Sequence, residues 1–155
     1  MKKPVVRIPA VKIEVFTPDR AGEVRQFVQG VLEGEGFGYD PVKDSDLEDI
    51  CGYYIDNGGM FYMGTIDGVV VGTGAVRRIS SKKCEIKRIY VKQEFRGRGF
   101  GKELFLKALG FARTHYHVVT LKTDRTLIEA INMYQEHGFS VVNENDDTLF
   151  FMYRP

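Results

Sequence analysis

The fold is decided by the stretch Val91-Lys92-Gln93-Glu94-Phe95-Arg96-Gly97-Arg98-Gly99-Phe100-Gly101. It places three glycines within six residues, after an alternating apolar run and before an amphipathic one. Glycine lets the backbone turn tightly and approach a ligand closely. A helix that begins here directs its free N–H groups and positive dipole end at the same point. With Arg96, Arg98 and Lys102 alongside, the stretch predicts an anion site suited to a pyrophosphate.

Two other phosphate-binding loops are excluded by their spacing. A Walker-type loop requires Gly-x-x-x-x-Gly-Lys-Ser/Thr, which the chain lacks. A dinucleotide-binding loop requires Gly-x-Gly-x-x-Gly after a first strand, whereas Gly97-x-Gly99-x-Gly101 follows an expected antiparallel meander. A strand–helix connection whose glycines serve packing alone remains the alternative.

The amino-terminal third of the chain predicts one strand and two helices. Residues 11–16 alternate as a strand, and Thr17-Pro18 opens a helix that ends in the glycines from Gly34 to Gly38. Ser45-Asp46-Leu47-Glu48 has the form of a capping box. It predicts a second helix, which Asn57-Gly58-Gly59 ends.

An antiparallel meander is predicted in the middle of the chain, with strands at 60–66, 69–79 and 84–91. The dipeptide Asp67-Gly68 is a strong signal for a two-residue hairpin turn between the first two. Strict alternation along the third strand would put four side chains on one face: Glu85, Lys87, Ile89 and Val91.

Helices and strands alternate in the remainder. Helices are expected at 100–115 and 126–137, and strands at 117–123, 140–142 and 149–153. The path from strand 84–91 through the first of these helices to strand 117–123 is a crossover, so the two strands should run parallel. The order β-α-α-β-β-β-α-β-α-β-β thus predicts an α/β fold with a mixed sheet. Ligands in such sheets bind at the carboxyl ends of strands where the topology switches, here near Val91 and Thr123.

Length and composition indicate one domain. The chain has 155 residues, and an apolar fraction of 43% is enough for a core without disulfides or metals. We therefore expect a single domain over 1–155, with residues 1–10 as an irregular extension.

Charge and motif content limit the partners. With 22 basic and 21 acidic residues, the chain lacks the basic excess typical of nucleic-acid binders, so no nucleic-acid partner is expected. No apolar run reaches transmembrane length, and no secretory signal is evident, so no membrane partner is expected either. Cys51 and Cys84 suit free thiols in a cytoplasmic compartment. His115 and His117 lack a third ligand, so no metal is expected.

Two motifs together resemble the GNAT superfamily of acyl-CoA-dependent N-acyltransferases. Arg96, Gly99 and Gly101 match its acyl-CoA-binding pattern, Gln/Arg-x-x-Gly-x-Gly/Ala. The run Ala130-Ile131-x-x-Tyr134-x-x-x-Gly138-Phe139 resembles its second CoA-side motif. The resemblance covers about residues 11–153 and matches the element order. Leu127 departs from the pattern, since many members carry Asn there.

The resemblance implies acetyl-CoA as the acyl donor and a sheet whose fourth and fifth strands splay apart to admit it. Backbone groups of strand 84–91 would pair with the pantetheine arm, and the glycine-rich loop would hold the pyrophosphate. A backbone N–H near Val91 would polarise the thioester carbonyl. The donor-binding residues so implied are Ile89, Tyr90, Val91, Arg96, Gly97, Arg98, Gly99, Phe100, Gly101 and Lys102.

Two side chains match the catalytic positions of the family. Tyr134 would protonate the departing thiolate, and its alternative role is that of a core aromatic whose hydroxyl is bonded locally. Glu85 would take the proton of the acceptor amine, and its alternative is an exposed carboxylate paired with Lys87 or Arg88. Lys87 and Arg88 themselves are most simply solvated charges.

The acceptor side is expected to form from residues 33–54 and 143–148. Phe37 and Tyr39 lie in a flexible, aromatic segment, and Arg77 is positioned to bind an acceptor carboxylate. The acidic residues from Asp40 to Asp49 would favour a cationic amine, or would merely cap the second helix. An amino acid carries both charges, so it is the expected acceptor, acetylated by direct attack in a ternary complex.

Three possibilities stay open from the sequence. The acceptor could be a protein or peptide amine, or the domain could bind acyl-CoA as a non-catalytic sensor. Homodimer formation is also possible, since members of the superfamily often dimerise.

Overall fold

The computed structural model describes residues 10–155. The extension expected over 1–10 falls almost wholly on residues 1–9 and lies outside the described residues. The strands are β1 Lys12–Val15, β2 Met60–Ile66, β3 Val69–Arg78, β4 Lys83–Val91, β5 Val118–Asp124, β6 Ser140–Glu144 and β7 Thr148–Tyr153. The α-helices are α1 Ala21–Gly34, α2 Phe100–His115 and α3 Ile128–Glu136. Short helical segments occupy η1 Pro18–Arg20, η2 Ser45–Glu48, η3 Cys51–Ile55 and η4 Gln93–Phe95.

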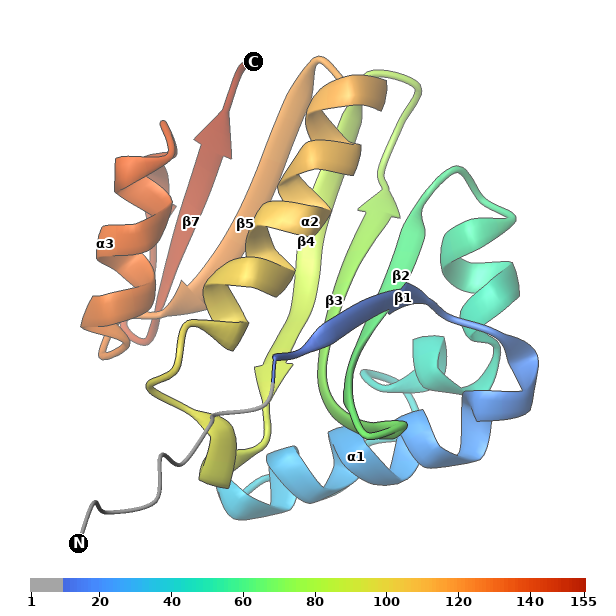
Figure 1. Cartoon of the computed structure of the whole chain (residues 1–155). Helices are drawn as coiled ribbons and strands as arrows, with labels where there is room; N and C mark the ends of the chain where they lie inside the picture. Colours follow the sequence, from blue (N-terminus) through green and yellow to red (C-terminus); the bar gives the residue numbers. More distant parts are fainter. Residues whose placement is uncertain (1–9) are drawn as a thin grey trace, which may run out of the picture.

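The strands form one mixed sheet in the order β1-β2-β3-β4-β5-β7-β6 (Figure 1). Neighbours pair antiparallel except β4 and β5, which are parallel, as the crossover through α2 predicts. Asp67 and Gly68 have φ values of 49° and 78°, which suits the hairpin turn expected between β2 and β3. The predicted fold class and element order are confirmed, except for the second helix.

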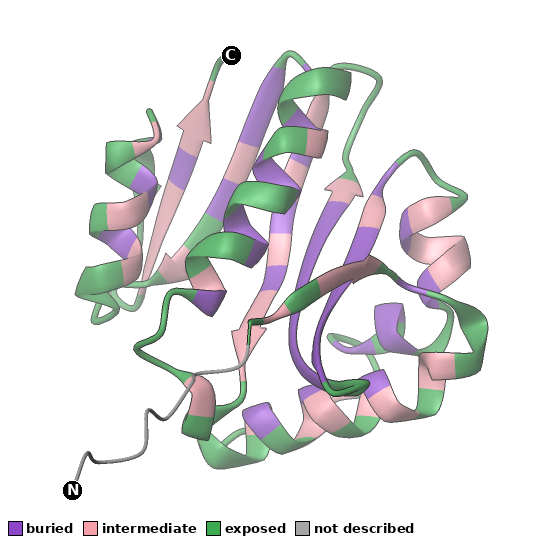
Figure 2. Cartoon of the chain, viewed as in Figure 1, coloured by how far each residue is buried: buried purple, intermediate pink, exposed green. Residues whose placement is uncertain are grey.

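The core lies on both faces of the sheet (Figure 2). On one face, α2 and α3 bury residues such as Phe105, Leu109 and Ile131 against β4, β5 and β7. On the other, α1 and η3 bury Val24 and Tyr54 against β2 and β3. Amphipathic helices account for this division, because their apolar stripes need a partner surface.

β4 and β5 part soon after they meet. Lys83, Cys84 and Glu85 pair with Val118, Val119 and Thr120, and the pairing stops there, although β4 continues to Val91 and β5 to Asp124. Figure 1 shows the two strands diverging towards their carboxyl ends. The predicted splay is therefore present, and it leaves one edge of β4 without a neighbouring strand.

A β-bulge interrupts β4 just beyond the last pair with β5. Ala75 faces Lys87 and Thr73 faces Tyr90, so Arg88 and Ile89 together stand opposite one residue, Gly74. Arg88 has a φ of 57°, and its carbonyl accepts a 2.7 Å hydrogen bond from the Thr73 hydroxyl. Bulges bend a strand and increase its twist, which favours divergence from β5.

The bulge overturns the expected common face of Glu85, Lys87, Ile89 and Val91. Ile89 packs against the cluster beneath α2, as do Cys84 and Ile86 before the bulge. The extra residue shifts the alternation by one, so Ile89 and Val91 turn to the α2 face while Glu85 and Lys87 stay on the α1 face.

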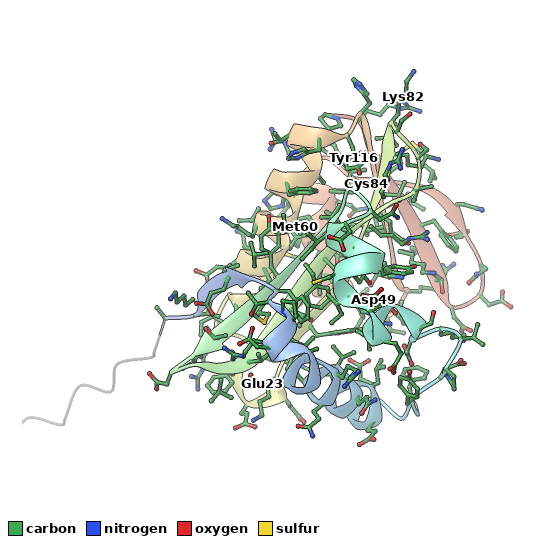
Figure 3. All side chains as sticks on the ribbon, turned by 90° about the vertical axis from the view of Figure 1, so that its right-hand side faces the viewer. Glu23, Asp49, Met60, Lys82, Cys84 and Tyr116 are labelled. Carbon is green, nitrogen blue, oxygen red and sulfur yellow. The ribbon has the colours of Figure 1, made fainter. Side chains whose placement is uncertain are left out.

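The second helix is replaced by two short pieces, η2 and η3, and the predicted capping box is wrong. The Ser45 hydroxyl donates to the Val42 carbonyl rather than capping a helix. Asp46 points inward because its carboxylate forms an ion pair with a buried cation, Arg88. Figure 3 views this side of the molecule, with Asp49 labelled between η2 and η3.

The prediction that Arg88 is a solvated charge is also wrong, since Arg88 is buried in an ion-pair network. Its Nη2 lies 2.7 Å from Asp46 Oδ1 and 3.0 Å from Asp44 Oδ1, and its Nε donates to Asp46 Oδ2. The Tyr54 hydroxyl donates to the same Asp46 oxygen. Burial raises the pKa of Asp46, but the bonds from Arg88 and Tyr54 outweigh it and hold the pKa below its usual range.

Removing the Asp46 carboxylate should destabilise the fold in a pH-dependent way. Asp46→Ala leaves Arg88 buried with Asp44 alone, and we expect a loss of about 3 kcal/mol in the free energy of unfolding at neutral pH. A carboxyl whose pKa is lowered by folding stabilises the fold above its unfolded pKa of about 3.9 and loses that contribution below it. Urea titrations should thus show a difference that is constant above about pH 5 and shrinks below about pH 4.

The Tyr54→Phe variant is the matched control for this network. It removes one bond to Asp46 but keeps the Arg88 pair, so it should cost about 1 kcal/mol. Equal losses for the two variants would contradict the assignment of Arg88 as the main partner.

Candidate functional site

The glycine-rich loop presents an unbroken set of free backbone donors. Gly97 and Gly99 adopt φ values of 79° and 82°, a region that glycine tolerates without strain. The first bond of α2 runs from Glu103 N–H to Gly99 C=O. Within residues 10–155, the N–H groups from Gly97 to Lys102 therefore have no backbone acceptor, and they meet the dipole end of a 16-residue helix.

The three cations expected around this loop take different positions. Arg96 donates from Nε to the Val91 carbonyl at 2.9 Å, which fixes the turn after β4. The Arg98 guanidinium lies over the Phe95 ring, 5.6 Å from its centroid, and Lys102 is exposed on the first turn of α2. Arg98 and Lys102 thus stay available to an anion, whereas Arg96 chiefly shapes the loop.

The open edge of β4 leads away from this loop. Ile89, Tyr90 and Val91 keep their register with β3 on one side, with Thr73 facing Tyr90 and Gly72 facing Val91. On the other side β5 has departed, so alternate backbone groups of β4 have no strand partner. An extended amide-bearing chain would pair there as an added strand would. The open edge of β4 and the loop of free N–H groups together fit an acyl donor of the CoA type.

Tyr134 lies on α3 among aromatic side chains, its ring centroid 5.1 Å from Phe105 and 5.8 Å from Phe151. Its hydroxyl bonds to none of residues 10–155, and the residue is buried. The locally satisfied core tyrosine weighed from the sequence is thus not found. Burial raises the pKa of Tyr134 to about 12, so the phenol stays protonated at neutral pH.

Glu85 lies at the apex of the opening, as the last residue of β4 that pairs with β5. The residue opposite Glu85 on β3 is Arg77, and 3.3 Å separate Arg77 Nε from Glu85 Oε1. The expected pairing of Glu85 with Lys87 or Arg88 does not occur. The Glu85 side chain is 13% exposed, so it is mostly enclosed rather than a free surface carboxylate.

The acidic residues expected to receive a cationic amine are occupied by the protein itself. Asp44 and Asp46 bind Arg88, Asp40 accepts from the backbone of Val42 and Lys43, and Asp49 accepts from Gly52 N–H. Asp44 and Asp46 are therefore buried and removed from an acidic acceptor surface, whereas the roles of Asp40, Glu48 and Asp49 in such a surface remain predictions.

The aromatic residues expected at the acceptor side are not brought to Arg77. Phe37 is 62% exposed in the loop after α1. The Tyr39 hydroxyl donates to Glu48, which in turn pairs with Arg25 of α1. The roles of Phe37, Tyr39 and Arg77 in binding an acceptor remain predictions.

Tyr53 and Lys87 were not singled out for the site from the sequence, yet they lie beside Glu85 and Arg77. Tyr53 comes from η3, and Arg77 Nη1 reaches its hydroxyl at 3.5 Å. The Lys87 ammonium lies 5.9 Å from the centre of the Tyr53 ring. Burial lowers the pKa of Lys87, although the charge of Glu85 opposes this. The alternation of β4 predicts that Lys87 shares a face with Glu85, but it does not predict that Tyr53 of η3 lies against Lys87.

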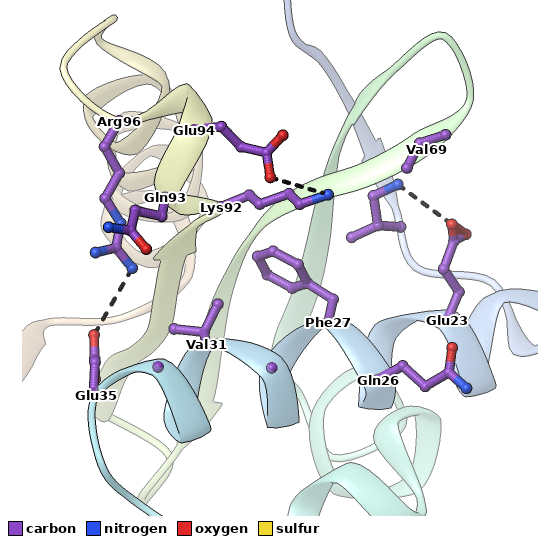
Figure 4. Close-up of a pocket in the computed structure, with 13 residues that line it drawn as sticks. Glu23, Gln26, Phe27, Val31, Glu35, Val69, Lys92, Gln93, Glu94 and Arg96 are labelled. Atoms are coloured by element: carbon purple, nitrogen blue, oxygen red, sulfur yellow. Dashed lines mark hydrogen bonds and ion pairs between the residues drawn. The ribbon is translucent and has the colours of Figure 1, made fainter.

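A groove of about 520 Å³ opens at the far end of β4 from Glu85, between α1 and the turn that follows β4 (Figure 4). Arg96 stands at its border, within 4.0 Å of Glu35, and Lys92 pairs with Glu94 at 3.5 Å. Phe27 and Val31 form its floor. The groove contains neither Glu85 nor Tyr134, so it does not coincide with the candidate catalytic residues.

Other chemistry is limited in the described part of the chain. Residues 10–155 bring no three His, Cys, Asp or Glu side chains together as metal ligands. None of their helices combines the length and the apolar character needed to cross a bilayer. Burial raises the pKa of the Cys84 thiol to about 12, which makes it a poor nucleophile.

Comparison with known proteins identifies the family. The profile of the Acetyltransferase (GNAT) family matches residues 28–139, which is most of the chain, and the chain belongs to this family. It is 35% identical to human N-acetylaspartate synthetase over 105 residues, which are 66% of this chain and 35% of that protein. The chain thus spans only 35–38% of the length of the human and zebrafish synthetases.

Solved structures show the same fold. A GNAT acetyltransferase from Staphylococcus aureus Mu50 has a TM-score of 0.80 at 22% identity, covering 94% of this chain and 99% of its own. The PaiA N-acetyltransferase from Thermoplasma acidophilum, crystallised with coenzyme A, has a TM-score of 0.72 at 16% identity, with 94% and 99% covered.

The glycine loop can be tested through Gly99→Ala. A side chain at a φ of 82° costs about 1 kcal/mol, so the loop should shift its N–H groups out of line. We expect the dissociation constant of CoA to rise by about tenfold or more, measured by calorimetry. Gly110→Ala, inside α2 with no atom near the added carbon, is the matched control and should leave CoA binding unchanged. Unchanged binding in Gly99→Ala would contradict the assigned donor site.

Proposed function

We propose that the protein transfers an acetyl group from acetyl-CoA to the primary amine of a small molecule such as an amino acid. One observation carries the proposal: the open edge of β4 ends in a loop of free N–H groups at the start of α2. The edge suits the pantetheine arm and the loop suits the pyrophosphate, so the thioester would lie near the apex of the opening, where Glu85 is found.

The proposed reaction is direct attack within a ternary complex. The neutral amine forms an N–C bond to the thioester carbonyl carbon, the C–S bond breaks, and the amine proton passes to Glu85, directly or through water. A backbone N–H on the open edge of β4, beside the thioester, stabilises the charge that develops on the carbonyl oxygen. Neither cysteine carries the acyl group, in keeping with the buried, weakly acidic Cys84 thiol.

Tyr134 is proposed to assist the leaving thiolate. Its hydroxyl is protonated and has no partner among residues 10–155, so it is free to donate to the sulfur. A thiolate with an ordinary pKa near 8.5 leaves without full protonation, so a hydrogen bond from Tyr134 would be sufficient. Loss of the hydroxyl should therefore slow the reaction without abolishing it.

The name printed for several relatives supports an amino-acid acceptor. They are N-acetylaspartate synthetases, although this chain spans only part of their length. Protein or peptide acetylation and a non-catalytic sensor role would give different results in the assay below.

Acetyl-CoA-dependent thiol release should require an acceptor. With a panel of amino acids, polyamines, aminoglycosides and short peptides, we expect thiol release with the amino acids. We also expect CoA to raise the melting temperature of the protein when no acceptor is present. Release with peptides only would favour the protein acetyltransferase. Stabilisation by CoA without release on any amine would favour the sensor, and no stabilisation would contradict the donor site.

Two substitutions should separate the catalytic roles. Glu85→Gln should lower kcat/KM by about 10²-fold or more at neutral pH, with a rate that rises about tenfold per pH unit towards the amine pKa near 10. Tyr134→Phe should lower kcat by about tenfold and leave the KM for acetyl-CoA unchanged. An unaltered kcat in Tyr134→Phe, measured under saturation, would remove the tyrosine from the mechanism.

A further inference from the structure

Glu85 is flanked by two cations that keep hydrogen-bond donors to spare. Arg77 Nε forms an ion pair with Glu85 Oε1 at 3.3 Å but completes no hydrogen bond, and Arg77 Nη1 donates to the Tyr53 hydroxyl at 3.5 Å. Lys87 forms neither an ion pair nor a hydrogen bond within residues 10–155, and its nearest polarised partner is the face of the Tyr53 ring. An ammonium that is partly removed from water and has no acceptor is costly, so Lys87 indicates a site for an anionic group beside the Arg77–Glu85 ion pair.

The neighbouring charges do not satisfy these donors. Arg88 is the next residue on β4, and it is held by Asp44 and Asp46 at 3.0 and 2.7 Å. Both oxygens of Asp46 are thereby engaged, one of them also by the Tyr54 hydroxyl. The carboxylates of η2 therefore neutralise Arg88 and leave Lys87 without an acceptor.

The sequence of charges along this face is positive, negative, positive. Arg77 and Glu85 face each other across β3 and β4, and Lys87 follows two residues later on the same face of β4. Two positions along a strand span roughly 6.6 Å, which places Lys87 within reach of a small molecule whose amine is held at Glu85. A ligand with a central amine between two carboxylates has the complementary order.

We infer that Arg77 and Lys87 form a carboxylate-binding subsite around Glu85, which selects dicarboxylic amino acids as acceptors. The inference rests on the proposed function, because Glu85 must receive the acceptor amine. In this arrangement one carboxylate binds Lys87 and the other binds the spare donors of Arg77, with the amine directed at Glu85. Tyr53 orients both cations through its ring and its hydroxyl. Polyamines and other cationic amines are rejected by the same two charges.

The selectivity of the unmodified protein is the first test. Thiol release from acetyl-CoA should give a higher kcat/KM for L-aspartate or L-glutamate than for L-asparagine, L-alanine or spermidine. Equal or better turnover of spermidine would overturn the subsite while leaving the acetyltransferase activity intact.

The second test replaces Lys87. Lys87→Met should raise the KM for the dicarboxylic acceptor by about 10- to 100-fold, as expected for one lost charge-assisted bond, and leave the KM for acetyl-CoA within about twofold. Lys82→Met, in the exposed turn between β3 and β4, changes the net charge equally and should change neither constant. If Lys87→Met lowers the melting temperature, Lys87→Gln is the second variant. An unchanged KM for the acceptor in a folded Lys87 variant would overturn the proposal.

Acceptor binding without turnover separates this inference from the proposed function. Calorimetry should detect L-aspartate binding to the CoA-saturated protein, lost in the Lys87 variant and kept in Lys82→Met. Lys87-dependent binding without turnover would uphold the subsite and refute the proposed reaction. Turnover that does not depend on Lys87 would uphold the proposed reaction and refute the subsite. Absence of both binding and turnover would refute the subsite and the reaction alike.

Discussion

Beyond Glu85 and Thr120, β4 and β5 no longer share hydrogen bonds, and this parting makes the rest of the site possible. A parallel pair of strands normally continues its ladder, because each unpaired backbone group would otherwise lose a partner. Here β5 remains paired with β7 from Val119 to Asp124, whereas β4 remains paired with β3. Each strand thus keeps one neighbour, and the two edges between them are left for a ligand that brings its own donors and acceptors.

The bulge in β4 and the network around Arg88 hold this opening in place. A left-handed conformation at a long side chain is unfavourable by about 1–2 kcal/mol. Two features offset it: the Thr73 hydroxyl binds the Arg88 carbonyl, and Asp44 and Asp46 bind the guanidinium. Because Asp46 belongs to η2, the same ion pairs fasten the segment after α1 to β4. The segment that contains η2 is therefore fixed to β4, the strand with the open edge, by one buried cation.

Much of this arrangement could be predicted from the sequence. The hairpin at Asp67-Gly68, the helix from Phe100 to His115 and the parallel pairing of β4 with β5 follow from local patterns and from the handedness of crossovers. The glycine loop could also be predicted, because free N–H groups at the start of a helix depend on local backbone geometry alone. These features are encoded within a few neighbouring residues.

The errors arose where distant residues decide the local structure. Ser45 to Glu48 matches a capping box, but the Arg88 guanidinium, 42 residues from Asp46, draws that carboxylate inward and prevents a continuous helix. Alternation placed Ile89 with Glu85, but the bulge opposite Gly74 reverses the facing of every later residue of β4. The sequence also predicts a solvated Lys87, because the side chains around it come from distant segments, with Tyr53 on η3 and Arg77 on β3.

Amide hydrogen exchange with and without CoA tests the central claim most directly, because it reports on the backbone groups that are assigned to the donor. Binding of CoA should slow exchange at the N–H groups from Gly97 to Lys102 and along Ile89 to Val91. Exchange in α1 and around the groove of Figure 4 should remain unchanged. Protection confined to that groove, or no protection in the loop and β4, would contradict the assignment of the opening between β4 and β5 as the donor site.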